Sequence, residues 1–232
     1  MKYLKKYPWI NKNIKYILVG IFFIVLIFIA IKWILHKIKM KYLHTTLLDI
    51  LKKTIPIFDK HNINYWAIGG TLLGSIREGG IIEHDDDIDI GILKKDYQRI
   101  NDIKGDFEKV GLVIESPKEN FFHIKIMKKS NNYNKNKIFI DVFPYEKKEN
   151  KYIFSYLSAR KTWPNAYFLN DEIFPFKKSR LNDIEINIPN KSVLYLERFF
   201  GGCKNNNDCW KIPKVTHNHL DEINISLFDI SL

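Results

Sequence analysis

GGTLLGSIR, at residues 69–77, is followed eight residues later by DDDID at residues 85–89. In an extended backbone alternate side chains share a face, so Asp85, Asp87 and Asp89 are expected to project together. Crowded carboxylates repel one another unless a cation lies between them. Mg2+ or Mn2+ takes oxygen ligands and leaves coordination positions for substrate phosphates. The pattern therefore predicts a metal-bound nucleotide and phosphoryl-type transfer chemistry.

The glycine pair before the acidic run is expected to contact substrate. Residues 64–68 are typical of a short buried strand, and the segment from Thr71 to Arg77 is typical of a short helix. Gly69 and Gly70 lie at the turn between them, where backbone N–H groups at a helix N-terminus can approach an anion closely. Arg77 is expected to contact another phosphate oxygen. These two glycines, Thr71 and Arg77 are thus the predicted substrate-binding residues.

Three other interpretations of the acidic run compete with this one. A helix-loop-helix calcium loop requires glycine at its sixth position, where Ile90 stands, and Ile88 and Ile90 suit a strand better than a solvated loop. A solvated run of charges is the second interpretation. The third is the Asp-x-Asp metal motif of a nucleotide-sugar glycosyltransferase, which Asp87 and Asp89 alone satisfy. Only the upstream glycine turn argues against it.

A further carboxylate lies in the apolar segment KIFIDVFP, residues 137–144, which is expected to form a second strand closed by Pro144. A lone buried carboxylate is costly, so Asp141 is either paired structurally or placed beside the first acidic cluster. Near a metal and an acceptor hydroxyl, such a carboxylate can act as general base. The pattern favours the functional interpretation of Asp141.

Four parts of this sequence, in order, resemble the signature of the LicD family, which includes bacterial phosphocholine transferases, fukutin and fukutin-related protein. They are GGTLLG-x-x-R, residues 79–82, the Asp-x-Asp-x-Asp stretch and the apolar strand with Asp141. Glu83 and His84 depart from the aromatic or small residues that the family usually carries there. This departure is expected to alter substrate choice rather than chemistry.

The resemblance covers residues 62–213. Residues 198–201 and 210–213 are more loosely similar to the aromatic-Gly and Trp-Pro ending of the family, with a longer gap between them. The resemblance implies an α+β fold, a nucleotidyltransferase-like domain with a small mixed sheet flanked by helices. It also implies transfer of phosphocholine or a phospho-alditol, such as ribitol phosphate, from a cytidine-diphosphate (CDP) donor to a glycan hydroxyl.

In this interpretation Asp87, Asp89 and Asp141 are the catalytic residues, and Asp85, Asp87 and Asp89 bind Mg2+ or Mn2+. Asp141 is a metal ligand or the general base. Two alternatives use the same residues differently. One is a nucleotidyltransferase that releases pyrophosphate, and the other is a non-catalytic, membrane-bound module that binds a partner enzyme or the donor.

The N-terminal part of the chain predicts a membrane anchor. Residues 17–31 carry no charge, and a transmembrane helix is expected over residues 16–35, after a basic tail at residues 1–15. An amphipathic juxtamembrane helix is expected at residues 36–61, bent or ended by Pro56, before the catalytic domain at residues 62–232. A cleaved signal peptide is the main alternative, but no small-x-small cleavage pattern follows the apolar core.

The charge distribution argues for lipid and against nucleic acid as a partner. The chain has a net charge of +11, yet residues 1–44 hold nine lysines and no acid, so 11 − 9 leaves +2 for the rest. Lysines that flank a span contact anionic headgroups. Since they are nearly equal in number on both sides, the orientation stays open. A single-pass protein is expected, with a secretory-pathway, Golgi-like lumenal domain if the source is eukaryotic.

Two features outside these motifs add smaller expectations. The Lys- and Asn-rich residues 128–137 are typical of a hairpin loop before the Asp141 strand. Cys203 and Cys209 are expected to form a disulfide in an oxidising compartment and to stay reduced in the cytosol. A zinc site that combines them with His217 and His219 lacks familiar spacing.

Overall fold

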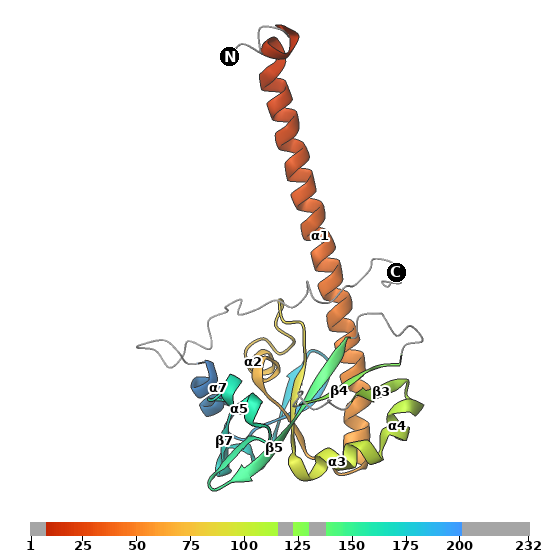
Figure 1. The fold of residues 1–232 in the computed structure, drawn as a ribbon, viewed down its shortest axis with the longest axis vertical. Coiled ribbons are helices and arrows are strands. Elements are labelled where there is room, and N and C mark those ends of the chain that lie inside the picture. Colours follow the sequence, from red (N-terminus) through yellow and green to blue (C-terminus); the bar gives the residue numbers. More distant parts are fainter. Residues whose placement is uncertain (1–7, 116–122, 130–137, 201–232) are drawn as a thin grey trace.

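The computed structural model describes residues 8–115, 123–129 and 138–200, and it consists of one long helix that runs into an α+β domain (Figure 1). Helix α1 (Pro8–Lys60) is continuous, so the two helices expected at residues 16–35 and 36–61 are one element. It does not end at Pro56. The missing N–H of Pro56 removes one intrahelical bond, but Ile57 and Phe58 are buried in the domain and hold the last turn in place.

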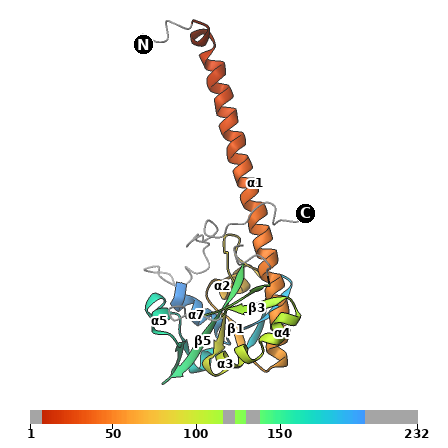
Figure 2. The same ribbon diagram turned by 45° about the vertical axis from the view of Figure 1, so that its right-hand side comes forward.

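The two halves of α1 differ in what surrounds them. Its apolar side chains from Ile17 to Ile34 are exposed, whereas Met40, Leu43 and Leu47 are buried against the domain. Within the described residues α1 is the one helix long and apolar enough to cross a membrane. Figure 2 shows the exposed half projecting well beyond the domain. The helix therefore joins the apolar segment directly to the domain core.

The central sheet is mixed, as the sequence predicts. Its main strands follow the order β1-β2-β5-β4-β3, in which β2 and β5 are parallel and every other neighbouring pair is antiparallel. Strands β6 and β7 extend the sheet from the far end of β5. The bounds are β1 (Tyr65–Ala67), β2 (Asp89–Leu93), β3 (Leu112–Glu115), β4 (Ile124–Lys128), β5 (Phe139–Lys148), β6 (Lys151–Phe154) and β7 (Phe168–Leu169).

Short helices and a second, two-stranded sheet surround this framework. The sheet is an antiparallel hairpin of β8 (Lys177–Leu181) and β9 (Ile184–Ile188) beside α2 and β1. The helices are α2 (Gly69–Arg77), α3 (Lys94–Asp102), α4 (Lys104–Lys109), α5 (Leu157–Thr162), α6 (Asn170–Ile173) and α7 (Ser192–Phe200). The fold class is therefore α+β, with the mixed sheet flanked by helices.

Strand β5 is longer than the sequence suggested. It continues through Pro144 to Lys148, so the expected end of the strand at Pro144 is wrong. Proline is tolerated in a strand where no ladder bond requires its N–H, and the carbonyl of Pro144 still accepts a hydrogen bond from Ser155 N at 2.8 Å. Strands β4 and β5 pair antiparallel on either side of residues 130–137, which lie outside the described residues.

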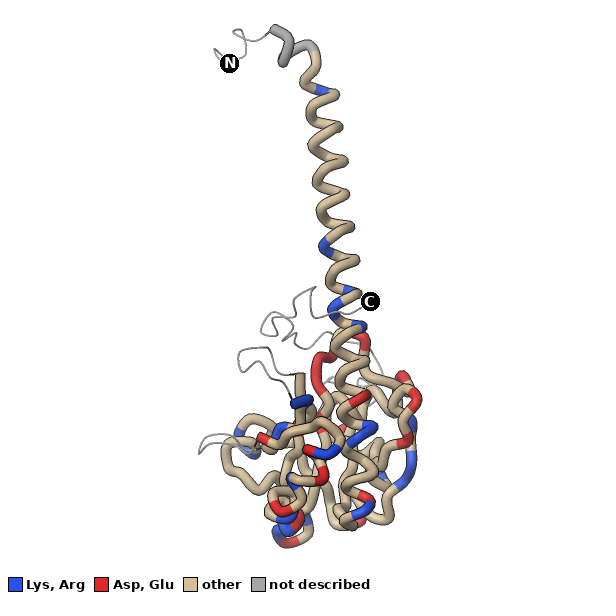
Figure 3. The backbone as a smooth tube through the Cα atoms, turned by 90° about the vertical axis from the view of Figure 1, so that its right-hand side faces the viewer, with Lys and Arg blue, Asp and Glu red and all other residues tan. Residues whose placement is uncertain are grey.

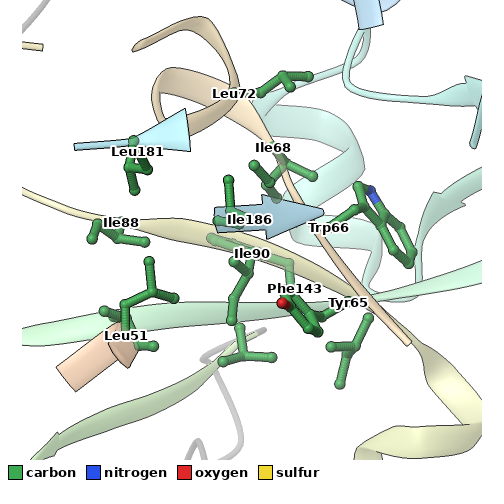
Figure 4. Close-up of a cluster of buried hydrophobic side chains, with 14 of the residues drawn as sticks. Leu51, Tyr65, Trp66, Ile68, Leu72, Ile88, Ile90, Phe143, Leu181 and Ile186 are labelled. Atoms are coloured by element: carbon green, nitrogen blue, oxygen red, sulfur yellow. The ribbon is translucent and has the colours of Figure 1, made fainter. Parts of the chain in front are cut away.

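The core lies between the sheet, α1 and α2, and includes Trp66 (Figure 4). Trp66 is fully buried and faces Gly91 across the β1–β2 pair. A Cβ on Gly91 would lie 2.7 Å from the indole ring, so only glycine leaves room for Trp66 there. This contact anchors β2, the strand that begins with Asp89.

Candidate active site

The acidic run forms an extended loop that leads into β2. Strand β2 begins at Asp89, so the strand expected over the whole acidic run is wrong for its first part: Asp85 and Asp87 lie in the preceding loop. Asp85 N donates to the carbonyl of Ile82 at 2.9 Å. The first strand residue is held by α2, because Asp89 N donates to the hydroxyl of Thr71 at 2.7 Å. Thr71 thus positions the acidic strand.

Pairing of the parallel strands brings the third carboxylate to the cluster. Asp89 on β2 and Asp141 on β5 are direct partners in the register, and Asp141 N donates to the carbonyl of Ile88 at 2.8 Å. One carboxylate oxygen from each of Asp87, Asp89 and Asp141 lies within 4.8 Å of the others. The sheet therefore places Asp141 beside the first acidic cluster.

Asp85 belongs to a second group. Its carboxylate lies within 4.8 Å of those of Asp86 and Asp87, and Asp87 is the member common to both groups. Asp85 also shares a hydrogen bond with Asp87. The structure thus groups Asp89 with Asp87 and Asp141, and not with Asp85. Asp85 is linked to that group through the shared member, Asp87, by their hydrogen bond.

Burial and mutual repulsion raise the pKa values of these acids. Burial is the main cause for Asp89, whose pKa lies well above its usual value, with Asp87 and Asp141 adding to the shift. Burial likewise raises the pKa of Asp141 to about 8, although Lys125 partly opposes this shift. Burial together with Asp87 and Asp86 raises the pKa of Asp85 to about 8. These raised pKa values keep the acids partly protonated near neutral pH. A bound cation would stabilise their ionised carboxylates, so ionisation of the cluster and cation binding favour each other.

The donor set fits a hard divalent cation. Mg2+ and Mn2+ prefer carboxylate oxygens and are held by a few of them while they keep positions for water and phosphate. Asp87, Asp89 and Asp141 offer three such oxygens within reach of one ion. Asp86, whose buried Oδ2 has no hydrogen-bond partner among the described residues, belongs to the neighbouring group with Asp85 and Asp87. Asp87 and Asp89 would hold the predicted Mg2+ or Mn2+, with Asp141 as a further ligand or as the general base.

The two glycines make room for the carboxylates. Gly69 has φ +53, and a Cβ there would lie 3.1 Å from Asp89 Oδ2, while a Cβ on Gly70 would lie 2.4 Å from Asp85 Oδ2. Both residues belong to α2, which begins at Gly69 rather than at Thr71 as expected. The Gly69 N–H donates to the hydroxyl of Tyr195 at 3.3 Å. The structure thus gives the glycines a packing role, and their contact with phosphate stays a prediction.

Arg77 lies at the other end of α2. It is eight positions after Gly69, which corresponds to roughly 12 Å along the helix axis. Its guanidinium forms an ion pair with Glu78, with Nη2 2.5 Å from Oε1. The structure therefore does not bring Arg77 together with the N-terminus of α2, and its contact with donor phosphate stays a prediction.

Residues that the sequence analysis did not select also lie at the site. Lys125 on β4 is the register partner of Asp141, so both side chains lie on one face of the sheet. His123 Nε2 lies 3.1 Å from Asp141 Oδ1, and burial together with Lys125 lowers the pKa of His123 to about 4. His123 and Lys125 alternate in sequence with the buried Ile124 and Ile126. This alternation could have shown that the His123 and Lys125 side chains share the sheet face on which Asp141 lies.

A mixed sheet that clusters aspartates at two adjacent parallel strands, next to a helix beginning with two glycines, defines a nucleotidyltransferase-like domain. The comparison with protein families agrees. The model described as "LicD/FKTN/FKRP, nucleotidyltransferase domain" matches residues 62–191. The chain belongs to the LicD family.

Curated relatives share part of their length with this chain. An uncharacterized protein of Rickettsia prowazekii is 33% identical over 153 residues, which are 66% of this chain and 53% of that protein. The mouse ribitol-5-phosphate transferase FKTN is 27% identical over 170 residues, 73% of this chain and 33% of that protein. The Haemophilus influenzae lipopolysaccharide cholinephosphotransferase LicD is 35% identical over 69 residues, 30% of this chain and 26% of that protein. The chain thus spans about half, or less, of these relatives.

Several sequence-based expectations concern other parts of the chain. Cys203 and Cys209, with the proposed disulfide or zinc site, lie outside the described residues, as does the Trp-Pro segment at 210–213. The aromatic segment before them is described only as far as Phe200, where α7 ends.

Proposed function

We propose that this chain is a membrane-anchored, metal-dependent transferase that moves phosphocholine or a phospho-alditol from a CDP-linked donor to a glycan hydroxyl. The observation that carries this proposal is the convergence of Asp87, Asp89 and Asp141 within a LicD-family domain. Named relatives transfer ribitol 5-phosphate or phosphocholine, which supports the same group-transfer chemistry here.

In this proposal the three aspartates divide the work. Asp87 and Asp89 hold Mg2+ or Mn2+, which, when bound, neutralises charge on the transferring phosphate. Asp141 accepts the proton of the attacking hydroxyl. A pKa raised to about 8 by burial makes its carboxylate a stronger base than an exposed aspartate, which suits proton abstraction near neutral pH. Lys125, on the same face, would offset negative charge of the donor.

Anchoring is proposed from the exposed half of α1. Its apolar surface has no partner within the described part of the chain, and its length is sufficient to cross a bilayer. Lysines near both ends of the apolar segment would contact anionic headgroups. The span is proposed to cross the membrane once.

One alternative is nucleotide transfer to the acceptor, which the description of the matching family model as a nucleotidyltransferase domain favours. The two reactions give different products. Transfer of the phospho-alcohol releases CMP, whereas transfer of the nucleotide releases pyrophosphate from a nucleoside triphosphate.

The test uses the full chain in detergent with Mg2+ or Mn2+ and a panel of CDP-choline, CDP-ribitol, CDP-glycerol, nucleoside triphosphates and nucleotide sugars. We expect CMP release from one CDP-alcohol, loss of that release in Asp89→Asn, and retention in the control Asp183→Asn. Asp183 is an exposed acid that contacts Lys52 and belongs to neither group of clustered carboxylates. Release of pyrophosphate or a nucleoside diphosphate instead, or full activity in Asp89→Asn, would contradict the proposal.

A further inference from the structure

The loop that carries the acidic cluster lies against α1 at the point where this helix leaves the domain. Lys37 of α1 forms an ion pair with Glu83 of the loop. Further along the helix, His44 Nε2 lies 2.6 Å from the carbonyl oxygen of Asp85. Figure 3 shows an acidic segment beside the tube of α1 at the top of the domain. The site is thus close to the apolar half of the helix.

Distances along α1 follow from its regular rise. The predicted span ends at Leu35, so Lys37 lies about 3 Å and His44 about 14 Å beyond it at 1.5 Å per residue. The headgroup layer on each side of a bilayer is about 5–8 Å thick. If the apolar half spans a membrane, Glu83 lies at headgroup level and Asp85, beside His44, lies about 6–9 Å beyond the headgroup layer, at the height of a sugar attached to a lipid.

The domain has no linker that would let it move away from the membrane. Helix α1 continues without interruption from Pro8 to Lys60, and Met40, Leu43 and Leu47 are already packed in the domain core. Separation of the loop from the helix would break the contacts of Lys37 and His44 as well. The distance between the acidic cluster and the bilayer is therefore set by the protein.

We propose, resting on the proposed function, that the acceptor is a lipid-linked glycan embedded in the same bilayer. A sugar attached to a membrane lipid lies at the height of the cluster and is concentrated there by the shared membrane. A soluble glycoprotein is not concentrated at this height by the membrane. The membrane-proximal site thus selects acceptors that the membrane itself carries.

The transfer step is balanced without a further reactant. The glycan hydroxyl oxygen forms a bond to the donor phosphorus that bears the alcohol. The bridging bond from that phosphorus to the oxygen of CMP breaks, and CMP leaves with the electron pair. The hydroxyl proton passes to Asp141.

The location of the loop can be tested without the reaction. A photo-crosslinking amino acid replaces Glu83 in the full chain, reconstituted in nanodiscs of phosphatidylcholine and phosphatidylglycerol. The control replaces Glu149, which follows β5 and lies roughly 26 Å from Asp141 along that strand. We expect lipid adducts, identified by mass spectrometry, from position 83 and not from position 149. Absence of adducts at position 83, or equal yields at both positions, would overturn the inference.

The acceptor class is tested by moving the domain outward. A seven-residue helical insertion between Leu35 and His36 adds about 10 Å and nearly preserves the helix phase, so the contacts of Lys37 and His44 remain. The same insertion between Asn13 and Ile14, on the other side of the span, is the matched control. With a radiolabelled CDP-alcohol and host membranes, we expect label in the organic extract to fall about tenfold or more only in the first variant.

The outcomes separate the two proposals. Absence of CMP release from every CDP-alcohol by the wild-type chain would refute the proposed function itself. Release of CMP with label on soluble protein, or unchanged lipid labelling in the Leu35–His36 insertion, would leave the proposed function standing and overturn the lipid-linked acceptor. Equal rates of CDP-alcohol hydrolysis, measured as CMP release with water as the acceptor, in both insertion variants show that the domain is intact.

Discussion

Replacement of Gly70 by alanine is expected to distort the acidic cluster while leaving the fold intact. The added Cβ would lie 2.4 Å from Asp85 Oδ2, and ordinary contact begins at 3.4 Å, so the carboxylate must move by about 1 Å. Asp85 shares a hydrogen bond with Asp87, so the displacement reaches a predicted metal ligand. Misplacement of reacting groups by 1 Å costs on the order of a hundredfold in rate, and we expect CMP release to fall by about 10- to 100-fold.

The stability of the same variant should change little. Gly70 has no left-handed φ, and alanine is favoured over glycine in a helix by about 1 kcal/mol. Overpacking costs about 1–3 kcal/mol, and the clashing atom is the mobile end of a side chain. The two effects oppose each other, so the free energy of unfolding should stay within about 2 kcal/mol of the wild type.

The assay is Mn2+ titration by isothermal calorimetry together with thermal unfolding of the full chain in detergent. Gly105→Ala is the matched control, because a Cβ there meets nothing within 4 Å and Gly105 lies in helix α4. We expect weaker Mn2+ binding in Gly70→Ala and unchanged binding in the control. Wild-type Mn2+ affinity in Gly70→Ala would refute the reasoning that this glycine exists to admit Asp85.

Three further predictions follow from the charges. Asp89→Asn should abolish CMP release yet raise the unfolding temperature of the metal-free chain. The reason is that burial and the neighbouring carboxylates destabilise the charged form of Asp89, as its raised pKa shows. A lower unfolding temperature would contradict this prediction. The pKa values of Asp85 and Asp141, about 8 when folded and near 3.8 when unfolded, mean that the native state keeps protons which the unfolded state has lost, so metal-free stability should fall as pH rises from about 4 to 8. Thermal unfolding with and without Mn2+ should accordingly show a larger stabilisation by Mn2+ at pH 8 than at pH 6, and a pH-independent effect would count against it. Arg198→Met should cost about 3–5 kcal/mol in chemical denaturation, because Glu172, 2% exposed and 2.6 Å from Arg198, would be left as an unpaired buried charge, and the double variant with Glu172→Gln should recover much of the loss.

Where prediction from sequence succeeded, short-range patterns were sufficient. Short apolar runs identified the strands around Tyr65 and Asp141, and the glycine-rich run identified α2. The resemblance to the LicD family implied the mixed sheet and the nucleotidyltransferase-like class, and the sheet topology and the family match confirm both. The register β2–β5 could not be read from spacing, because 52 residues separate Asp89 from Asp141 and only strand pairing brings them into contact.

Other expectations failed because tertiary packing overrides local signals. Pro56 usually ends a helix and Pro144 a strand, yet buried neighbours and an unneeded N–H let both elements continue. The expectation for Arg77 is untested: it lies at the opposite end of α2 from the glycines and pairs with Glu78, and its contact with a phosphate stays a prediction.

By itself the sequence determined the family and the presence of an apolar segment long enough to span a membrane, because residue types and short spacings encode these properties. Only the tertiary structure decided which carboxylates converge, why Gly69 and Gly70 must lack side chains, and where the acidic loop lies relative to α1. The physical reason is that these features depend on contacts between segments distant in the chain, such as Asp89 with Asp141 and His44 with Asp85, which form only when the sheet and the long helix pack together.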